Sequence, residues 1–122
     1  MNQRALDLLE ESAAGVTIVR LTGRIDSGTA SELALALGRL LLGTRPRVVL
    51  DLGAVEHLSG AGLRVLVSAS RGVAQRDPRG MLVLCGLSRK LSEVLAISGV
   101  DTALTHCPSR AEAVAWALAM RN

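Results

Sequence analysis

The stretch HLSGAGLRVLV, residues 57–67, places a histidine, a serine and two glycines between an apolar run and a helical pattern. A serine on such a turn invites comparison with the G-x-S-x-G nucleophile elbow, which needs glycine two residues before and after the serine. Position 57 is histidine, so Ser59 does not meet that pattern. A catalytic base two residues before its serine is rare, and we expect His57 to lie half exposed at a strand end. The stretch gives no support for nucleophilic catalysis.

A glycine-rich turn before a helix can also hold phosphate, because the first backbone N–H groups of a helix have no partner within it. The sequence lacks G-x-x-x-x-G-K-[ST] and G-x-G-x-x-G, and its single lysine is Lys90. The helix N-terminus is then the one feature that supports nucleotide binding, which stays open as an alternative function.

Acidic and sulfur side chains give no metal-ligating or acid–base pattern. The acidic residues Asp26, Asp51, Glu56, Asp77 and Asp101 are spread over separate predicted loops and strand ends. The two cysteines, Cys85 and Cys107, fit no ligand spacing, so we expect small buried side chains in a reducing compartment. We predict a chain that is not an enzyme and needs no metal or cofactor.

The turn at residues 59–62 has two remaining interpretations. Ser59 can cap the following helix, and Gly60, Ala61 and Gly62 leave the backbone open to another surface. These small residues could equally serve only a tight turn between strand and helix. The local sequence does not separate a docking site from a structural turn.

Composition narrows the class of protein. The chain has 122 residues, 49% of them hydrophobic, which predicts one domain over residues 1–122 with its own core. It contains no Phe or Tyr, and Trp116 is its one tryptophan. Its net charge is +3, and scattered arginines supply almost all of the positive charge. We therefore expect neither nucleic-acid binding nor membrane insertion. With no apparent signal peptide or membrane span, a cytoplasmic location is expected.

Strand and helix patterns alternate along the chain. Alternating or continuous apolar residues predict strands at residues 5–12, 16–22, 48–52, 81–86 and 103–107, the first two forming a hairpin around Gly15. The first of these could also be a helical turn. Apolar residues at helical spacing predict helices after residues 29, 59, 88 and 109. The fold class is α/β, with a mostly parallel central sheet, a hairpin at one edge and about four helices.

Capping residues and inward faces are predicted for the helices. Asp26, Ser27 or Thr29 can cap the first helix, with Glu32 completing a capping box after Thr29. Ser59, Ser88 and Ser109 are expected to cap the later helices, and Gly99 to end the third. In the last helix, Ala113, Trp116, Ala117 and Met120 are expected to face inward.

Four segments resemble the STAS domain family, specifically bacterial anti-sigma factor antagonists. They are LTGRIDSGTASELALAL, RVVLDLGAVEHLSGAGLRVLVSA, GMLVLCGLSRKLSEVLAISGVD and ALTHCPSRAEAVAWAL, and the resemblance spans roughly residues 15–118. It implies a STAS-like fold and a non-enzymatic role in transcription regulation by partner switching. The implied partner is an anti-sigma factor that is also a serine kinase of the histidine-kinase-like ATPase type, with a cognate phosphatase as a further partner. A monomer or weak dimer is expected.

The resemblance also implies a binding site and a phosphoacceptor. Residues matching the family's binding loops are Arg24, Asp26, Ser27, His57, Leu58, Ser59, Gly60, Ala61, Gly62 and Arg64. The family's usual motif is Asp-Ser-[Ser/Ala]-Gly-Leu, in which the first serine accepts phosphate. Aligned on Gly62 and Leu63, this chain has Ser59 in place of the aspartate and Gly60 in place of the acceptor.

Three interpretations of this departure remain open. The chain can bind its partner without kinase control, which we favour. Ser59 can serve as a displaced acceptor, although a shift of one residue turns the hydroxyl by about 100° around a helix. Alternatively, the chain can regulate a transporter or another signalling complex.

Overall fold

The computed structural model describes residues 5–100 and 103–119. Strands and helices follow one another in the predicted order β-β-α-β-α-β-α-β-α. Their bounds are β1 Leu6–Ala13, β2 Val16–Ile25, α1 Ala30–Leu40, β3 Arg47–Leu58, α2 Gly60–Arg76, β4 Met81–Cys85, α3 Arg89–Ser98, β5 Thr105–Cys107 and α4 Arg110–Ala119. The predicted fold class is confirmed, and the first segment is a strand and not a helical turn.

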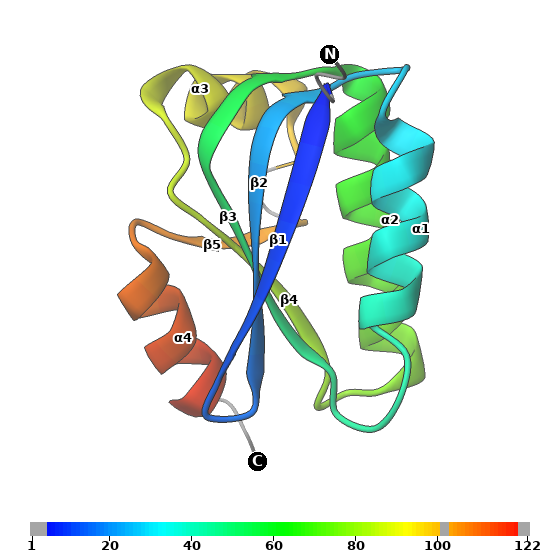
Figure 1. Cartoon of the computed structure of the whole chain (residues 1–122), viewed down its shortest axis with the longest axis vertical. Helices are drawn as coiled ribbons and strands as arrows, with labels where there is room; N and C mark the ends of the chain where they lie inside the picture. The colour runs from blue at the N-terminus through cyan, green and yellow to red at the C-terminus, as the bar shows by residue number, and fades with distance from the viewer. Residues whose placement is uncertain (1–4, 101–102, 120–122) are drawn as a thin grey trace.

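The five strands form one sheet in the order β1-β2-β3-β4-β5 (Figure 1). β1 and β2 pair antiparallel, and every other neighbouring pair is parallel. Ala14 and Gly15 make the two-residue turn between β1 and β2, both with positive φ, as tight hairpins require. The sheet is thus mostly parallel with the predicted hairpin at one edge.

Helices cover the two faces of the sheet unequally (Figure 1). Leucines of α1, α2 and α3 pack with one face in a large apolar cluster, while Ala113 and Ala117 of α4 pack on the other face. Side chains alternate along β2: Val16 and Ile18 join the α4 cluster, and Val19 and Leu21 the large one. Both faces of the central strands are therefore buried. The large cluster contains no aromatic side chain.

Two strands run further than the sequence patterns predicted. The predicted strand at 16–22 continues to Ile25, and the one at 48–52 continues to Leu58. Parallel pairing of β2 with β3 persists through two register shifts, between Arg20 and Thr22 and between Gly23 and Arg24. These bulges absorb residues that interrupt the apolar pattern, and the backbone hydrogen bonds of the pair continue beyond them.

The predicted capping box at the start of α1 is wrong. Thr29 holds the N-cap position, but its side chain makes no capping hydrogen bond with the helix. Its hydroxyl instead donates to the Arg24 carbonyl oxygen at 2.9 Å and accepts from the Asp26 N–H at 3.0 Å. The hydroxyl is used to close the preceding loop, which explains why it is unavailable to the helix.

Caps of the later helices are confirmed. Side-chain oxygens of Ser59, Ser88 and Ser109 each accept from the backbone N–H three residues onward. Gly99 ends α3 in the left-handed conformation. Trp116 is half-buried against the α4 cluster, and Met120 lies outside the described residues. Within the described residues, no helix is both long and apolar enough to cross a membrane.

Candidate functional site

Parallel pairing brings the two predicted binding loops together at the carboxyl ends of β2 and β3. Arg24 lies opposite His57, and Ile25 lies opposite Leu58. The Ser59 N–H donates to the Ile25 carbonyl oxygen at 2.8 Å, which fastens the start of the α2 turn to the end of β2. The segments containing Asp26 and Ser59 therefore form one edge of the domain, above the starts of α1 and α2 (Figure 1).

The loop between β2 and α1 is held by its own side chains. Asp26 Oδ1 accepts from the Gly28 N–H at 2.9 Å, and Asp26 Oδ2 lies 3.6 Å from Arg24 Nε. The Thr29 hydroxyl, in a side chain only 6% exposed, ties both ends of the loop together. Arg24 and Ser27 remain exposed, so the loop offers a firm backbone with a cationic and a hydroxyl side chain at its surface.

The turn before α2 depends on close packing. The Ser59 hydroxyl oxygen accepts from the Gly62 N–H at 3.3 Å and caps the helix. A Cβ atom on Gly62 would lie 2.5 Å from Ile25 Cγ2 and 2.9 Å from Leu58 Cδ1. Leu58 itself is 4% exposed. Leu58 and Gly62 are both among the predicted binding residues. They are buried, and their packing fixes the conformation of the turn.

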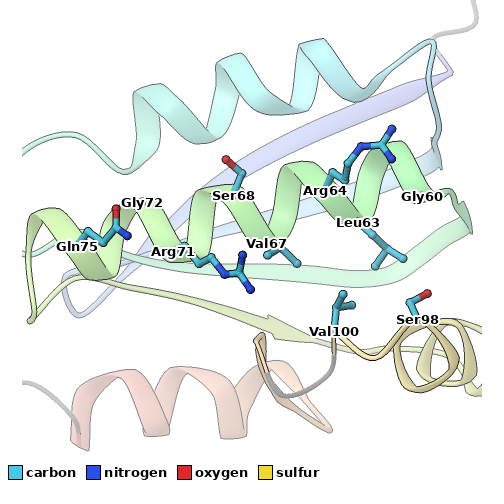
Figure 2. Close-up of a pocket in the computed structure, with 10 residues that line it drawn as sticks. All are labelled: Gly60, Leu63, Arg64, Val67, Ser68, Arg71, Gly72, Gln75, Ser98 and Val100. Atoms are coloured by element: carbon cyan, nitrogen blue, oxygen red, sulfur yellow. The ribbon is translucent and has the colours of Figure 1, made fainter.

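Gly60 differs sharply from Gly62. It is the first residue of α2, it is exposed, and a Cβ atom there would meet no heavy atom within 4 Å. No steric reason forces glycine at this position. On the α2 side of the site, the exposed residues are Gly60 and, one helical turn later, Arg64 (Figure 2). His57 and Ala61 are half-buried beside them.

This edge offers hydrogen-bond donors and cations, in keeping with a surface for binding. The first turn of α2 contains no acidic residue, so the positive end of the helix dipole and Arg64 are not offset there. Among the described residues, no three His, Cys, Asp or Glu side chains gather as a possible metal site.

Sequence reasoning missed contacts that only the topology creates. Arg110 at the start of α4 donates through Nε and Nη2 to Asp51 Oδ2 at 3.1 and 2.9 Å, and through Nη1 to Glu11 Oε2 at 2.9 Å. Asp51 Oδ1 accepts from the Gly53 N–H, as expected for a carboxylate that orders the next turn. Cys85 and Cys107 are register neighbours on β4 and β5, and both are free thiols.

The chain matches the model of the STAS domain over residues 9–113. It is 34% identical over 110 residues to BtrV of Bordetella bronchiseptica, which is named as an anti-sigma factor antagonist; the match covers 90% of this chain and 93% of BtrV. It is 32% identical over 76 residues to the anti-sigma-F factor antagonist RsfB of Mycobacterium tuberculosis, covering 62% of each chain.

Solved structures agree with these sequence matches. An anti-sigma factor antagonist from Mycobacterium paratuberculosis superposes with a TM-score of 0.82 at 25% identity, covering 93% of this chain and 94% of that one. The sheet, the helices and the sequence matches all support one assignment: this chain belongs to the STAS domain family and is similar to bacterial anti-sigma factor antagonists.

Proposed function

We propose that this chain is a non-enzymatic binding module that holds an anti-sigma factor at the edge formed by the β2–α1 loop and the α2 turn. Binding is independent of phosphorylation at position 60. The observation that carries the proposal is Gly60, an exposed residue without a hydroxyl group at the position where the resemblance places the acceptor serine. The names of the relatives support an anti-sigma factor as the partner.

A phosphate at this place would act on the complex and not on the fold. A phosphoserine carries about −1.5 to −2 charges, which a helix N-terminus tolerates but an opposing protein surface does not. Gly60 cannot accept that charge. The anti-sigma factor, expected to be a serine kinase of the histidine-kinase-like ATPase type, therefore has no means to release itself through residue 60, and no phosphatase is needed to restore binding.

Ser59 is a poor substitute acceptor. Its side-chain oxygen already accepts from the Gly62 N–H, and its backbone N–H is bonded to Ile25. Esterifying the hydroxyl would place phosphate beside a closely packed turn and replace a helix cap. A kinase would have to reach a half-buried hydroxyl that is already engaged in this turn, so we expect little or no modification of Ser59.

The test is incubation with the cognate anti-sigma kinase and ATP, followed by intact-mass spectrometry. We expect no phosphate on residue 60 and little or none on Ser59. Stoichiometric phosphorylation of Ser59 would defeat kinase-independent binding. Ser59→Ala locates any modification that is found.

Calorimetry tests whether the turn is the interface. Gly60→Glu places a carboxylate in open space at the helix N-terminus, so the domain should stay folded while the affinity for the anti-sigma factor falls at least about tenfold. Arg79→Glu, at an exposed position in the turn after α2, is the control. Unchanged affinity for the Gly60 variant would place the interface elsewhere.

A further inference from the structure

A groove of about 870 Å³ runs along the outer side of α2 toward the end of α3. We call it the α2 groove, and Figure 2 draws the residues that line it. Leu63 and Val67 project from α2 toward Val100, which follows α3, and these three side chains form an apolar floor (Figure 2). The groove begins at Gly60 and continues past Arg64 to Arg71 and Gln75.

Among the described residues that line the groove, the charged ones are both arginines. No acidic residue occurs anywhere in α2, whereas Arg64 and Arg71 both line the groove and are exposed. Neither has an ion-pair or hydrogen-bond partner within residues 5–100 and 103–119, in contrast to Arg39 and Arg110, which pair with carboxylates. Two guanidinium groups beside an apolar floor complement a surface that is both apolar and anionic.

The two arginines also have a defined spacing. They are seven residues apart on α2, which places them about 10.5 Å apart along the helix axis and within about 20° of the same face. In Figure 2, Arg64 extends to the α1 side of the helix and Arg71 to the Val100 side. Both side chains start from this shared face and are exposed, so a helix lying along α2 would meet the two guanidinium groups about two turns apart while its apolar stripe rests on Leu63 and Val67.

We infer that the α2 groove binds an amphipathic helix of the protein partner that carries carboxylates about two turns apart. This rests on the proposed function for the identity of the partner, because Gly60 lies in both the turn and the groove. The groove supplies apolar contact area and orientation, and the two arginines select for an acidic segment.

A second copy of the chain does not fit this description. The described parts of the four helices contain one carboxylate in α1 (Glu32), none in α2, one in α3 (Glu93) and one in α4 (Glu112). None can present a pair two turns apart. The occupant therefore comes from another protein.

The probe is a helical peptide of about 18 residues with a leucine stripe and two glutamates seven positions apart, a length that can form helix. Its twin carries two lysines at those positions. Binding to the full chain is followed by fluorescence anisotropy and by backbone amide chemical shifts. We expect the glutamate peptide to bind at least about tenfold more tightly, with shifts concentrated in α2 and near Val100.

Charge reversal provides the decisive comparison. Arg64→Glu/Arg71→Glu should lose the glutamate peptide and gain the lysine peptide. Arg79→Glu/Lys90→Glu changes the net charge equally at exposed sites outside the groove and should bind as the unaltered chain does. Equal affinity for the two peptides, an equal loss in the control variant, or shifts outside the groove would each overturn the inference. Arg64→Gln/Arg71→Gln repeats the test without adding charge.

Failure of this inference is distinguishable from failure of the proposed function. If Arg64→Glu/Arg71→Glu leaves binding to the anti-sigma factor unchanged while Gly60→Glu weakens it, the groove is not used and the turn is. If the glutamate peptide binds the groove but the unaltered chain does not bind the anti-sigma factor, the groove serves another acidic partner and the proposed function is wrong.

Discussion

Two glycines in the α2 turn have different physical reasons for their presence. Gly62 lies against β2, where a methyl group has no room, whereas Gly60 faces open space. Gly62, which packing requires, is thus also the glycine of the family motif that this chain resembles. Gly60 is unconstrained by packing, which directs attention to function at that residue.

Gly62→Ala should therefore destabilise the domain. A Cβ atom 2.5 Å from Ile25 Cγ2 forces the turn or the β2 end to move, and overpacking of this kind costs about 1–3 kcal/mol. Gly60→Ala is the matched control and should be neutral or stabilising by up to about 1 kcal/mol, because alanine favours helix. Urea unfolding of both variants measures the difference; equal midpoints would mean that the close approach is not rigid.

At the scale of elements, Arg110 connects three parts of the chain that the sequence separates widely. It begins α4 and binds Asp51 of β3 and Glu11 of β1. The shared carboxylates raise the pKa of the Arg110 guanidinium, with the hydrogen bonds to Asp51 as the largest cause. The contact holds α4 against the sheet face opposite the one that α1 and α2 cover.

Arg110→Ala should cost about 1–2 kcal/mol, since it leaves the partly buried Asp51 carboxylate without its charged donor. Arg39→Ala removes the exposed pair with Glu10 at 2.8 Å and should change stability by less than about 0.5 kcal/mol. Chemical unfolding of the two variants compares a partly buried network with a surface pair. A similar loss in both would show that burial of Asp51 adds nothing.

Periodicity predicted the elements well and their ends poorly. Apolar spacing was sufficient for α2 because Leu63, Leu66 and Val73 recur on one buried face. It was insufficient for β3, whose apolar run stops at Gly53 although pairing with β2 continues to Leu58. Backbone hydrogen bonds between neighbouring strands leave no mark in a pattern of side chains.

The candidate site was predicted as a set of residues, but, apart from the half-exposed His57, its division into exposed and buried members was not. Burial of Leu58 and Gly62 follows from their approach to Ile25, which is more than thirty residues away in the chain. The α2 groove needs Val100 beside α2, and nothing in the helix sequence indicates that neighbour. The absence of acidic residues from α2 is visible in the sequence, and this is the signal that could have pointed to the groove.

At the scale of the whole molecule, one buried thiol makes the free energy of unfolding depend on pH in the alkaline range. Cys85 is 0% exposed on β4, and burial, with the Asp51 charge as a smaller cause, raises its pKa from 9.0 to about 11. Between these values the unfolded chain loses the thiol proton while the folded chain keeps it. The unfolded state then binds fewer protons, so the free energy of unfolding falls as pH rises.

The domain should lose stability from about pH 9 and continue to lose it until about pH 11, at up to about 1.4 kcal/mol per pH unit for this one group. Urea unfolding in reducing buffer between pH 8 and pH 11 measures the slope, and Cys85→Ala should flatten it because the alanine has no proton to lose. Cys107→Ala, at the half-buried neighbour on β5, should leave most of the slope in place. If Cys85→Ala keeps the full slope, the loss belongs to other groups, and the buried thiol at the end of β4 ionises as freely in the folded chain as in the unfolded one.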